Sequence, residues 1–149
     1  MGFISGEMGM DYEECIDKGL LRKREDAKNW SNKEVKIARK FIKQAKQIIS
    51  TRAYESTVMI AYTSVFHSAR ALLYSQGFTE RSHYCIFVAL LHFYSHDHDF
   101  YEMVKTADMM RKGREETSYG GKIVYKEEAE FSVKFADTFL RAVKKKLKM

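Results

Sequence analysis

Proline is absent from this chain of 149 residues. Because proline is the strongest breaker of helices, its absence leaves long stretches free to be helical. Alanine, leucine, lysine, glutamate, arginine and methionine fill the segments in which apolar residues recur, and these residue types favour helices. The hydrophobic fraction of 45% and the charged fraction of 31% are typical of a folded domain and exclude a disordered chain.

Long apolar runs and targeting signals are also missing. No stretch approaches the roughly 20 apolar residues that cross a bilayer. The first ten residues, MGFISGEMGM, lack the basic start and the apolar centre of a signal peptide. We therefore expect a cytoplasmic protein that makes no contact with a membrane.

Cysteine is scarce, and the histidines do not form a convincing metal site. Cys15 and Cys85 show no CxxC spacing, so we expect two separate, buried or incidental thiols. His92 and His96 are four residues apart, which is a spacing of metal ligands, but no further ligand completes a site. A polar turn with solvated histidines is the simpler interpretation. We expect no metal and no cofactor.

Motifs of common enzyme classes are absent as well. The chain has no glycine-rich phosphate loop and no GxSxG nucleophile motif. The net charge of +6 permits a nucleic-acid partner without requiring one. Part of the excess lies in the C-terminal KKKLKM, where lysines also complement the dipole of a final helix turn.

Apolar residues at three- and four-residue spacing predict helices over residues 31–50, 51–76, 82–94, 100–116 and 126–148. Ser31 and Glu34 form a capping-box pattern at the first of these helices, and Gly77 predicts the end of the second. We expect an all-α fold, an antiparallel, up-and-down helical bundle of four main helices plus one or two short helices. Residues 31–149 would form this bundle, and residues 1–30 an N-terminal extension with a short helix.

The segment RKGREETSYGG, residues 111–121, departs from the amphipathic pattern. Its structural interpretation is a helix end, where Arg114 pairs with a glutamate and Tyr119 packs under the last helix. Gly120 and Gly121 would then reverse the chain. Outside this segment, His67 lies beside the inward stripe of the long helix and is most simply hydrogen-bonded to a neighbour. On the same helix, Arg70 would reach an acidic partner such as Glu116 or Asp137, or extend along the surface.

Four segments occur in an order that resembles the HEPN family, and within it the short prokaryotic proteins of the UPF0332 type. They are AYTSVFHSARALLYSQGF (61–78), SHYCIF (82–87), GREETSYGG (113–121) and EEAEFSVKFADTFLRAVKKKL (127–147). The resemblance covers roughly residues 31 to 147. The positions that match the family's pattern are Tyr62, Phe66, Ala69, Arg70, Ala71, Leu72, Leu73, Gly77, His83, Arg114, Tyr119 and Gly120.

The resemblance implies a homodimeric helical bundle that often accompanies a small nucleotidyltransferase in a toxin–antitoxin pair. Many relatives are metal-independent ribonucleases that use an arginine and a histidine in an R-x(4–6)-H motif. Here Arg114 is kept, but Tyr119 stands in place of the histidine, and an aspartate before the tyrosine is replaced by Ser118. An ordinary phenol titrates near ~10 and is a poor base at neutral pH.

The sequence therefore favours a binding protein over an enzyme. Arg114 and Tyr119 would form its functional site for a nucleotide or RNA phosphate, with Arg111, Arg70 and His83 as further ligand-binding residues. Three alternatives stay open. The chain could be a metal-independent endoribonuclease toxin that uses His83 or His67 with Arg114, a target of nucleotidylylation at Tyr119, or a purely structural helical bundle.

Overall fold

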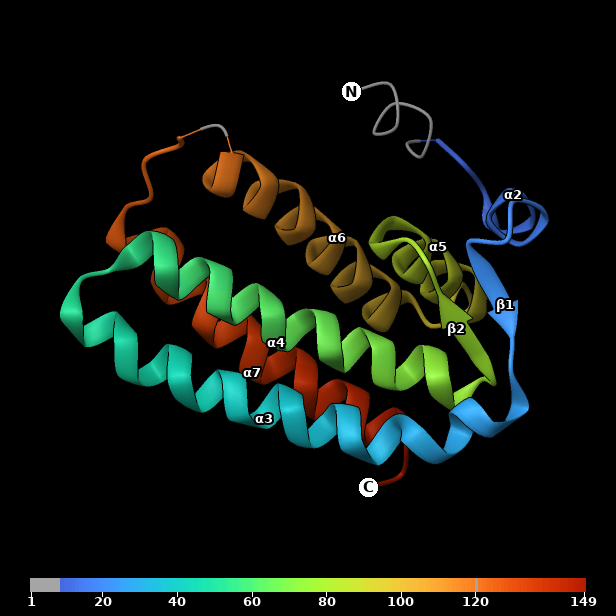
Figure 1. Ribbon diagram of the computed structural model, residues 1–149. Coiled ribbons are helices and arrows are strands. Elements are labelled where there is room, and N and C mark those ends of the chain that lie inside the picture. Colours follow the sequence, from blue (N-terminus) through green and yellow to red (C-terminus); the bar gives the residue numbers. More distant parts are fainter. Residues whose placement is uncertain (1–8, 120) are drawn as a thin grey trace.

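The computed structural model describes residues 9–119 and 121–149, without the side chains of residues 116, 118 and 119. Three long helices lie side by side: α3 (Ser31–Ile48), α4 (Tyr54–Ser75) and α7 (Lys126–Lys146). Helix α4 runs opposite to α3 and in the same direction as α7 (Figure 1). The all-α prediction is confirmed at this level.

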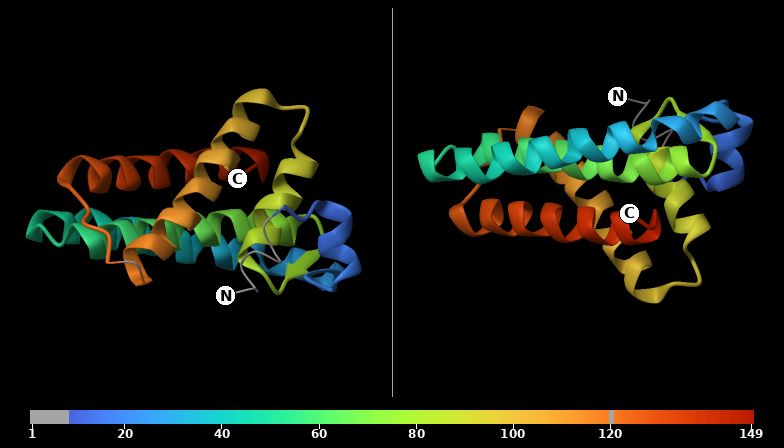
Figure 2. Two further views of the ribbon diagram at one scale, coloured as in Figure 1. Left: turned by 90° about the horizontal axis from the view of Figure 1, so that it is seen from above. Right: turned by 90° about the horizontal axis from the view of Figure 1, so that it is seen from below.

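The remaining long helix does not align with these three. A hairpin of α5 (His83–Phe93) and α6 (His98–Tyr119) packs beside α4, and α6 crosses α4 and α7 obliquely (Figure 2). Chain direction alternates from α3 to α4 to α6 to α7 (Figure 1), but the tilt of α6 makes the assembly less regular than the predicted four-helix bundle. Helix α6 also extends to Tyr119, beyond its predicted end at residue 116.

The core is built around α4, which is covered from several sides. Its buried residues occupy more than one face, because α3, α6 and α7 all pack against it. The largest fully buried side chains include Leu72, Leu73, Phe87 and Phe139. None of the described helices is long and apolar enough to cross a membrane.

The turn after α4 follows the prediction. Helix α4 ends at Ser75, and Gly77 adopts a φ of +79°, a left-handed conformation that favours glycine. At the end of α6, Gly121 has a φ of +69°, whereas Gly120 lies outside the described residues.

The N-terminal segment packs against the helices through a small sheet that the sequence did not predict. Helix α2 (Tyr12–Asp17), strand β1 (Leu21–Lys23), the 3-10 helix η1 (Glu25–Trp30) and strand β2 (Phe78–Glu80) form this end of the molecule, and a 3-10 turn, η2 (Ile49–Thr51), joins α3 to α4. The strands are antiparallel, with Leu21 opposite Glu80. Leu21 and Ala27 are buried.

The predicted capping box at α3 is wrong. Trp30, not Ser31, is the N-cap residue of α3. The Ser31 hydroxyl donates a hydrogen bond of 2.6 Å to the carbonyl of Ala71, and the Glu34 carboxylate faces α4. The local pattern was correct for a helix start, but tertiary contacts with α4 use both side chains.

The prediction of two separate thiols is also wrong. Cys15 of α2 and Cys85 of α5 form a disulfide, and both residues are fully buried. Seventy positions separate them in the sequence, so no local spacing indicated the bond. Packing of α2 against α5 brings their Cα atoms within 5.9 Å of each other.

We expect the disulfide to stabilise the fold by closing a loop of about 70 residues. The chain-entropy relation gives a contribution of about 4 kcal/mol for a loop of this length. In urea denaturation, Cys15→Ala/Cys85→Ala should lose about this free energy of unfolding. Wild-type protein treated with reductant should lose a similar amount, whereas the variant should not respond to reductant. A reductant effect on the variant would contradict this explanation.

Candidate functional site

Four of the five residues that the sequence predicted for the site lie close together. Arg70 comes from α4, His83 from the start of α5, and Arg111 and Arg114 from α6. The positive charges of all three arginines act on the His83 imidazole. Phe66 connects two of the residues, because its ring centroid lies 4.5 Å from Arg70 Cζ and 4.2 Å from the His83 ring centroid. We call Arg70, His83, Arg111 and Arg114 the arginine cluster.

Arg111 is the most deeply buried member of the cluster, with 7% of its surface exposed. Its Nε donates a hydrogen bond of 2.7 Å to Asp108 Oδ1, one turn earlier on α6. Its guanidinium carbon lies 5.2 Å from the centroid of the Tyr84 ring. Among the described residues, however, Arg111 Nη2 is buried and has no hydrogen-bond partner.

Tyr62 on α4 provides a second buried polar atom without a partner. The residue is 2% exposed, and its hydroxyl forms no hydrogen bond with any described group. Arg114 Cζ lies 5.8 Å from the centroid of the ring. Burial raises the pKa of the Tyr62 phenol, and the charges of Arg111 and Arg114 oppose this shift only in part. The phenol is therefore a neutral hydrogen-bond donor at physiological pH.

Arg114 is less constrained than Arg111. It is half-buried on α6, and its contact with the Tyr62 ring is electrostatic. It forms no ion pair with any side chain that the structure describes, and the side chain of Glu116 lies outside that set. Tyr119 is the last residue of α6, and its side chain also lies outside the described residues.

Arg70 has different partners from those predicted. Its Nε and Nη2 donate to Glu80 Oε2 at 3.1 and 2.6 Å, and its Nη1 lies 3.7 Å from Glu34 Oε1. Asp137, which the sequence offered as a partner, instead pairs with Lys46 and Arg141. The reversal at Gly77 explains the difference, because it returns β2 alongside the end of α4.

A carboxylate that sequence reasoning assigned to helix capping supports this arrangement. Glu34 is 7% exposed, and its Oε1 lies 2.7 Å from His67 Nδ1, which agrees with the prediction that His67 is hydrogen-bonded to a neighbour. Glu34 and Glu80 together hold Arg70 and His67 on the surface of α4. The sequence carried no signal for either acid, because the pairs join different elements of the fold.

His83 is the one member of the cluster whose side chain, when free in water, titrates near neutral pH. Phe66 covers one face of its ring, although the residue as a whole is exposed. Partial burial, followed by the charges of Arg114, Arg70 and Arg111, lowers the pKa of His83 to about 4. At pH 7 the His83 imidazole is therefore neutral.

The cluster thus combines cationic donors with a neutral imidazole. Guanidinium groups bind phosphate oxygens with charge-assisted hydrogen bonds. A neutral imidazole can accept a proton, which makes it a candidate general base. His92, which the sequence paired with His96 at a metal-ligand spacing, stacks on Tyr12 instead, with the two ring centroids 4.0 Å apart. No group of three potential metal ligands occurs within the described ranges.

The sequence model of the HEPN domain matches residues 32–146 of the chain. The matched region runs from the first turn of α3 to the end of α7 and contains every residue of the arginine cluster. A search of the curated proteins found no match.

We expect Arg114→Gln to raise the pKa of His83, because Arg114 is the strongest of the charges that lower it. Proton NMR titration of the imidazole measures this directly. Lys112→Gln removes one positive charge from an exposed neighbouring position and should leave the His83 titration unchanged.

The lowered pKa of His83 makes the free energy of unfolding depend on pH. In the unfolded chain His83 titrates near ~6.5, so acid favours the unfolded state. The contribution of His83 is fully present above that pH and is lost as the pH falls toward 4.

An unchanged His83 titration in Arg114→Gln would show that the two side chains are not coupled.

Proposed function

Because the chain belongs to the HEPN domain family, we propose that it binds a phosphate group of a nucleotide or RNA at the arginine cluster. We further propose that it does so as a homodimer and as the partner of a small nucleotidyltransferase in a toxin–antitoxin-type pair. One observation carries the binding proposal: Arg111 Nη2 and the Tyr62 hydroxyl are buried beside Arg114 and lack partners among the described residues. Tyr119, five positions after Arg114, stays a predicted member of the site.

The energetics of these two atoms favour an anionic ligand. A buried donor without a partner costs about 1–3 kcal/mol, so a site that leaves two of them unpaired gains when an acceptor arrives. Phosphate oxygens accept from guanidinium and phenol groups alike. Arg114, which no described carboxylate neutralises, supplies additional positive charge at the same place.

Apolar side chains near the same end of α6 support the homodimer. Met109 is 69% exposed and Phe131 is 54% exposed, and both line a groove of about 480 Å³ between α6 and α7. Ile123 and Tyr125, in the connection between these helices, are also exposed. A second copy of the chain that packs on this surface would bury this apolar area.

The binding proposal is tested by titrating the purified protein with ATP and with a 20-nucleotide single-stranded RNA. Arg114→Ala should weaken binding of both by about 10- to 100-fold, which corresponds to one charge-assisted hydrogen bond. Lys112→Ala, the control on the same helix, should bind like wild type.

Sedimentation of the same samples reports the oligomeric state, and pull-down with a co-expressed nucleotidyltransferase reports the partner. A monomeric protein that retains none of these ligands would rule out the proposal.

A second candidate function follows from the neutral state of His83 beside three arginines. His83 would take the proton of a ribose 2′-hydroxyl as the 2′-oxygen attacks the adjacent phosphorus. The bond to the 5′-oxygen would break, leaving a 2′,3′-cyclic phosphate. The departing 5′-oxygen would take a proton from water to become a 5′-hydroxyl, and His83 would return its proton to the solvent. The arginines would stabilise the charge that develops on the phosphoryl oxygens.

This second function predicts RNA cleavage that survives EDTA. His83→Ala and Arg114→Ala should each reduce cleavage by at least about 100-fold, in line with the loss of a general base or of a charge-stabilising donor. Lys112→Ala again serves as the control. Equal, negligible cleavage by wild type and both variants would leave binding as the function of the site.

A further inference from the structure

Positive charge is concentrated on one helix of the molecule. Helix α3 carries six lysines and arginines and one acid, Glu34, which is buried and contacts His67. The net charge of this helix is therefore +5, in a chain whose net charge is +6. The charged side chains on the exposed surface of α3 are all cations: Lys33, Lys36, Arg39, Lys40, Lys43 and Lys46.

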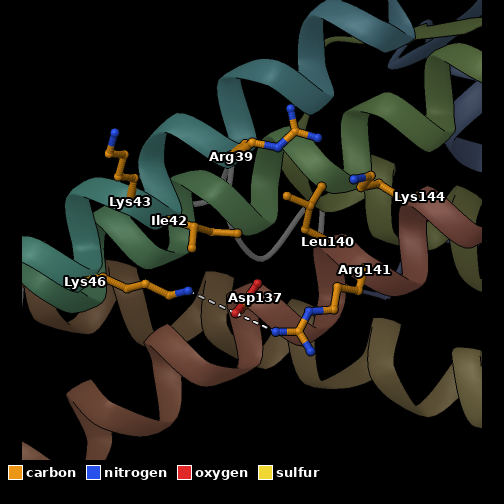
Figure 3. A pocket seen from close by; sticks show the side chains of 8 residues that line it. All are labelled: Arg39, Ile42, Lys43, Lys46, Asp137, Leu140, Arg141 and Lys144. Atoms are coloured by element: carbon orange, nitrogen blue, oxygen red, sulfur yellow. Dashed lines mark hydrogen bonds and ion pairs between the residues drawn. The ribbon is translucent and has the colours of Figure 1, made fainter. Parts of the chain in front are cut away.

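Part of this surface forms one wall of a groove, and α7 forms the other (Figure 3). The groove has a volume of about 330 Å³ and is separate from the arginine cluster, with which it shares no residue. Its floor is apolar, because Ile42 and Leu140 are each 5% exposed. We call it the basic groove, after the five cations that line it: Arg39, Lys43, Lys46, Arg141 and Lys144.

A single carboxylate lies among these cations. Asp137 Oδ2 accepts from Lys46 Nζ at 3.1 Å and from Arg141 Nη2 at 3.0 Å. Figure 3 shows both side chains reaching toward it. The other three cations have no carboxylate partner among the described residues, so the groove carries a net charge of +4.

We propose that the basic groove binds the sugar–phosphate backbone of a single-stranded nucleic acid. Helical rise places Arg39, Lys43 and Lys46 along about 10 Å of α3, a length over which one strand presents several phosphates. Arg141 and Lys144 repeat the charge on the opposite wall. The binding needs no base-specific contact, since cations that track a backbone recognise its charge.

The shape of the groove distinguishes this ligand from other polyanions. A cleft of about 330 Å³ between two helices has room for the backbone of one strand. Membrane association would require exposed apolar side chains among the basic ones. The two apolar residues that line the groove, Ile42 and Leu140, are buried in its floor. A flat anionic surface would leave the groove empty.

This inference does not depend on the function proposed for the arginine cluster. The two sites come from different helices and can be altered one at a time. A variant that is altered at one site and loses binding at both sites would contradict their separation.

The test measures fluorescence anisotropy of labelled 20-nucleotide single-stranded RNA and DNA of the same mixed sequence over a range of salt concentrations. Arg39→Gln/Lys43→Gln removes two cations of the groove, and Lys33→Gln/Lys36→Gln removes two exposed cations of α3 outside it. Each lost phosphate contact should reduce the salt slope by about 0.7. With affinities that converge at about 1 M salt, the loss of two contacts makes the groove variant bind about 25-fold more weakly at 0.1 M salt. The control should change little, and RNA and DNA should behave alike.

A second variant should strengthen binding, a result that misfolding does not produce. Asp137→Asn keeps the shape of the side chain, removes the only acid that lines the groove, and frees Lys46 and Arg141 for phosphate. We expect its affinity at 0.1 M salt to rise by at least about 5-fold, the gain from one added phosphate contact. Arg114→Ala should leave the effect of the groove substitutions unchanged.

Three results would overturn the proposal. One is equal weakening by the groove variant and the α3 control. Another is an affinity of Asp137→Asn at or below that of wild type. The third is competition: poly-glutamate or anionic phosphatidylglycerol vesicles that displace RNA as effectively as unlabelled RNA of equal charge would show a general polyanion surface.

Discussion

Close packing around α4 is the constraint on which both the fold and the candidate site depend. Alanines and serines such as Ala61, Ser64 and Ser68 are fully buried along this helix, so neighbouring helices approach it closely. The Ser64 hydroxyl bonds the carbonyl of Ala38, which fixes α3 against α4 at the backbone. Because α4 also carries Tyr62 and Arg70, the contacts that assemble the core determine the positions of the site residues as well.

The arginine cluster shows how like charges are held together at moderate cost. Carboxylates neutralise two of its arginines, since Glu80 pairs with Arg70 and Asp108 with Arg111. Aromatic faces approach the guanidinium groups of all three, and cation–π contacts are attractive in such positions. The charge left over is centred on Arg114, next to buried donors without described partners. Such an arrangement is stabilised when an anion or a second subunit supplies the missing acceptors.

The basic groove differs from the cluster in physical character. Its cations are mostly exposed, and their attraction for a polyanion is screened by salt. The cluster is partly desolvated, so its interactions are stronger per contact and more directional. If both proposals hold, the groove supplies general affinity for a nucleic-acid strand and the cluster engages one phosphate group. That division would suit a small protein that acts on, or shields, RNA.

Local sequence determined the helices, because apolar periodicity and residues such as Gly77 act within a few positions. It also determined the positive charge of α3, and the resemblance to the HEPN family picked out Arg114, Arg70 and His83. Only the tertiary structure decided that Cys15 bonds Cys85, that Glu34 faces His67, and that Glu80 rather than Asp137 holds Arg70. These pairs join residues of different elements, so they depend on how helices pack and turns reverse, which no local pattern encodes.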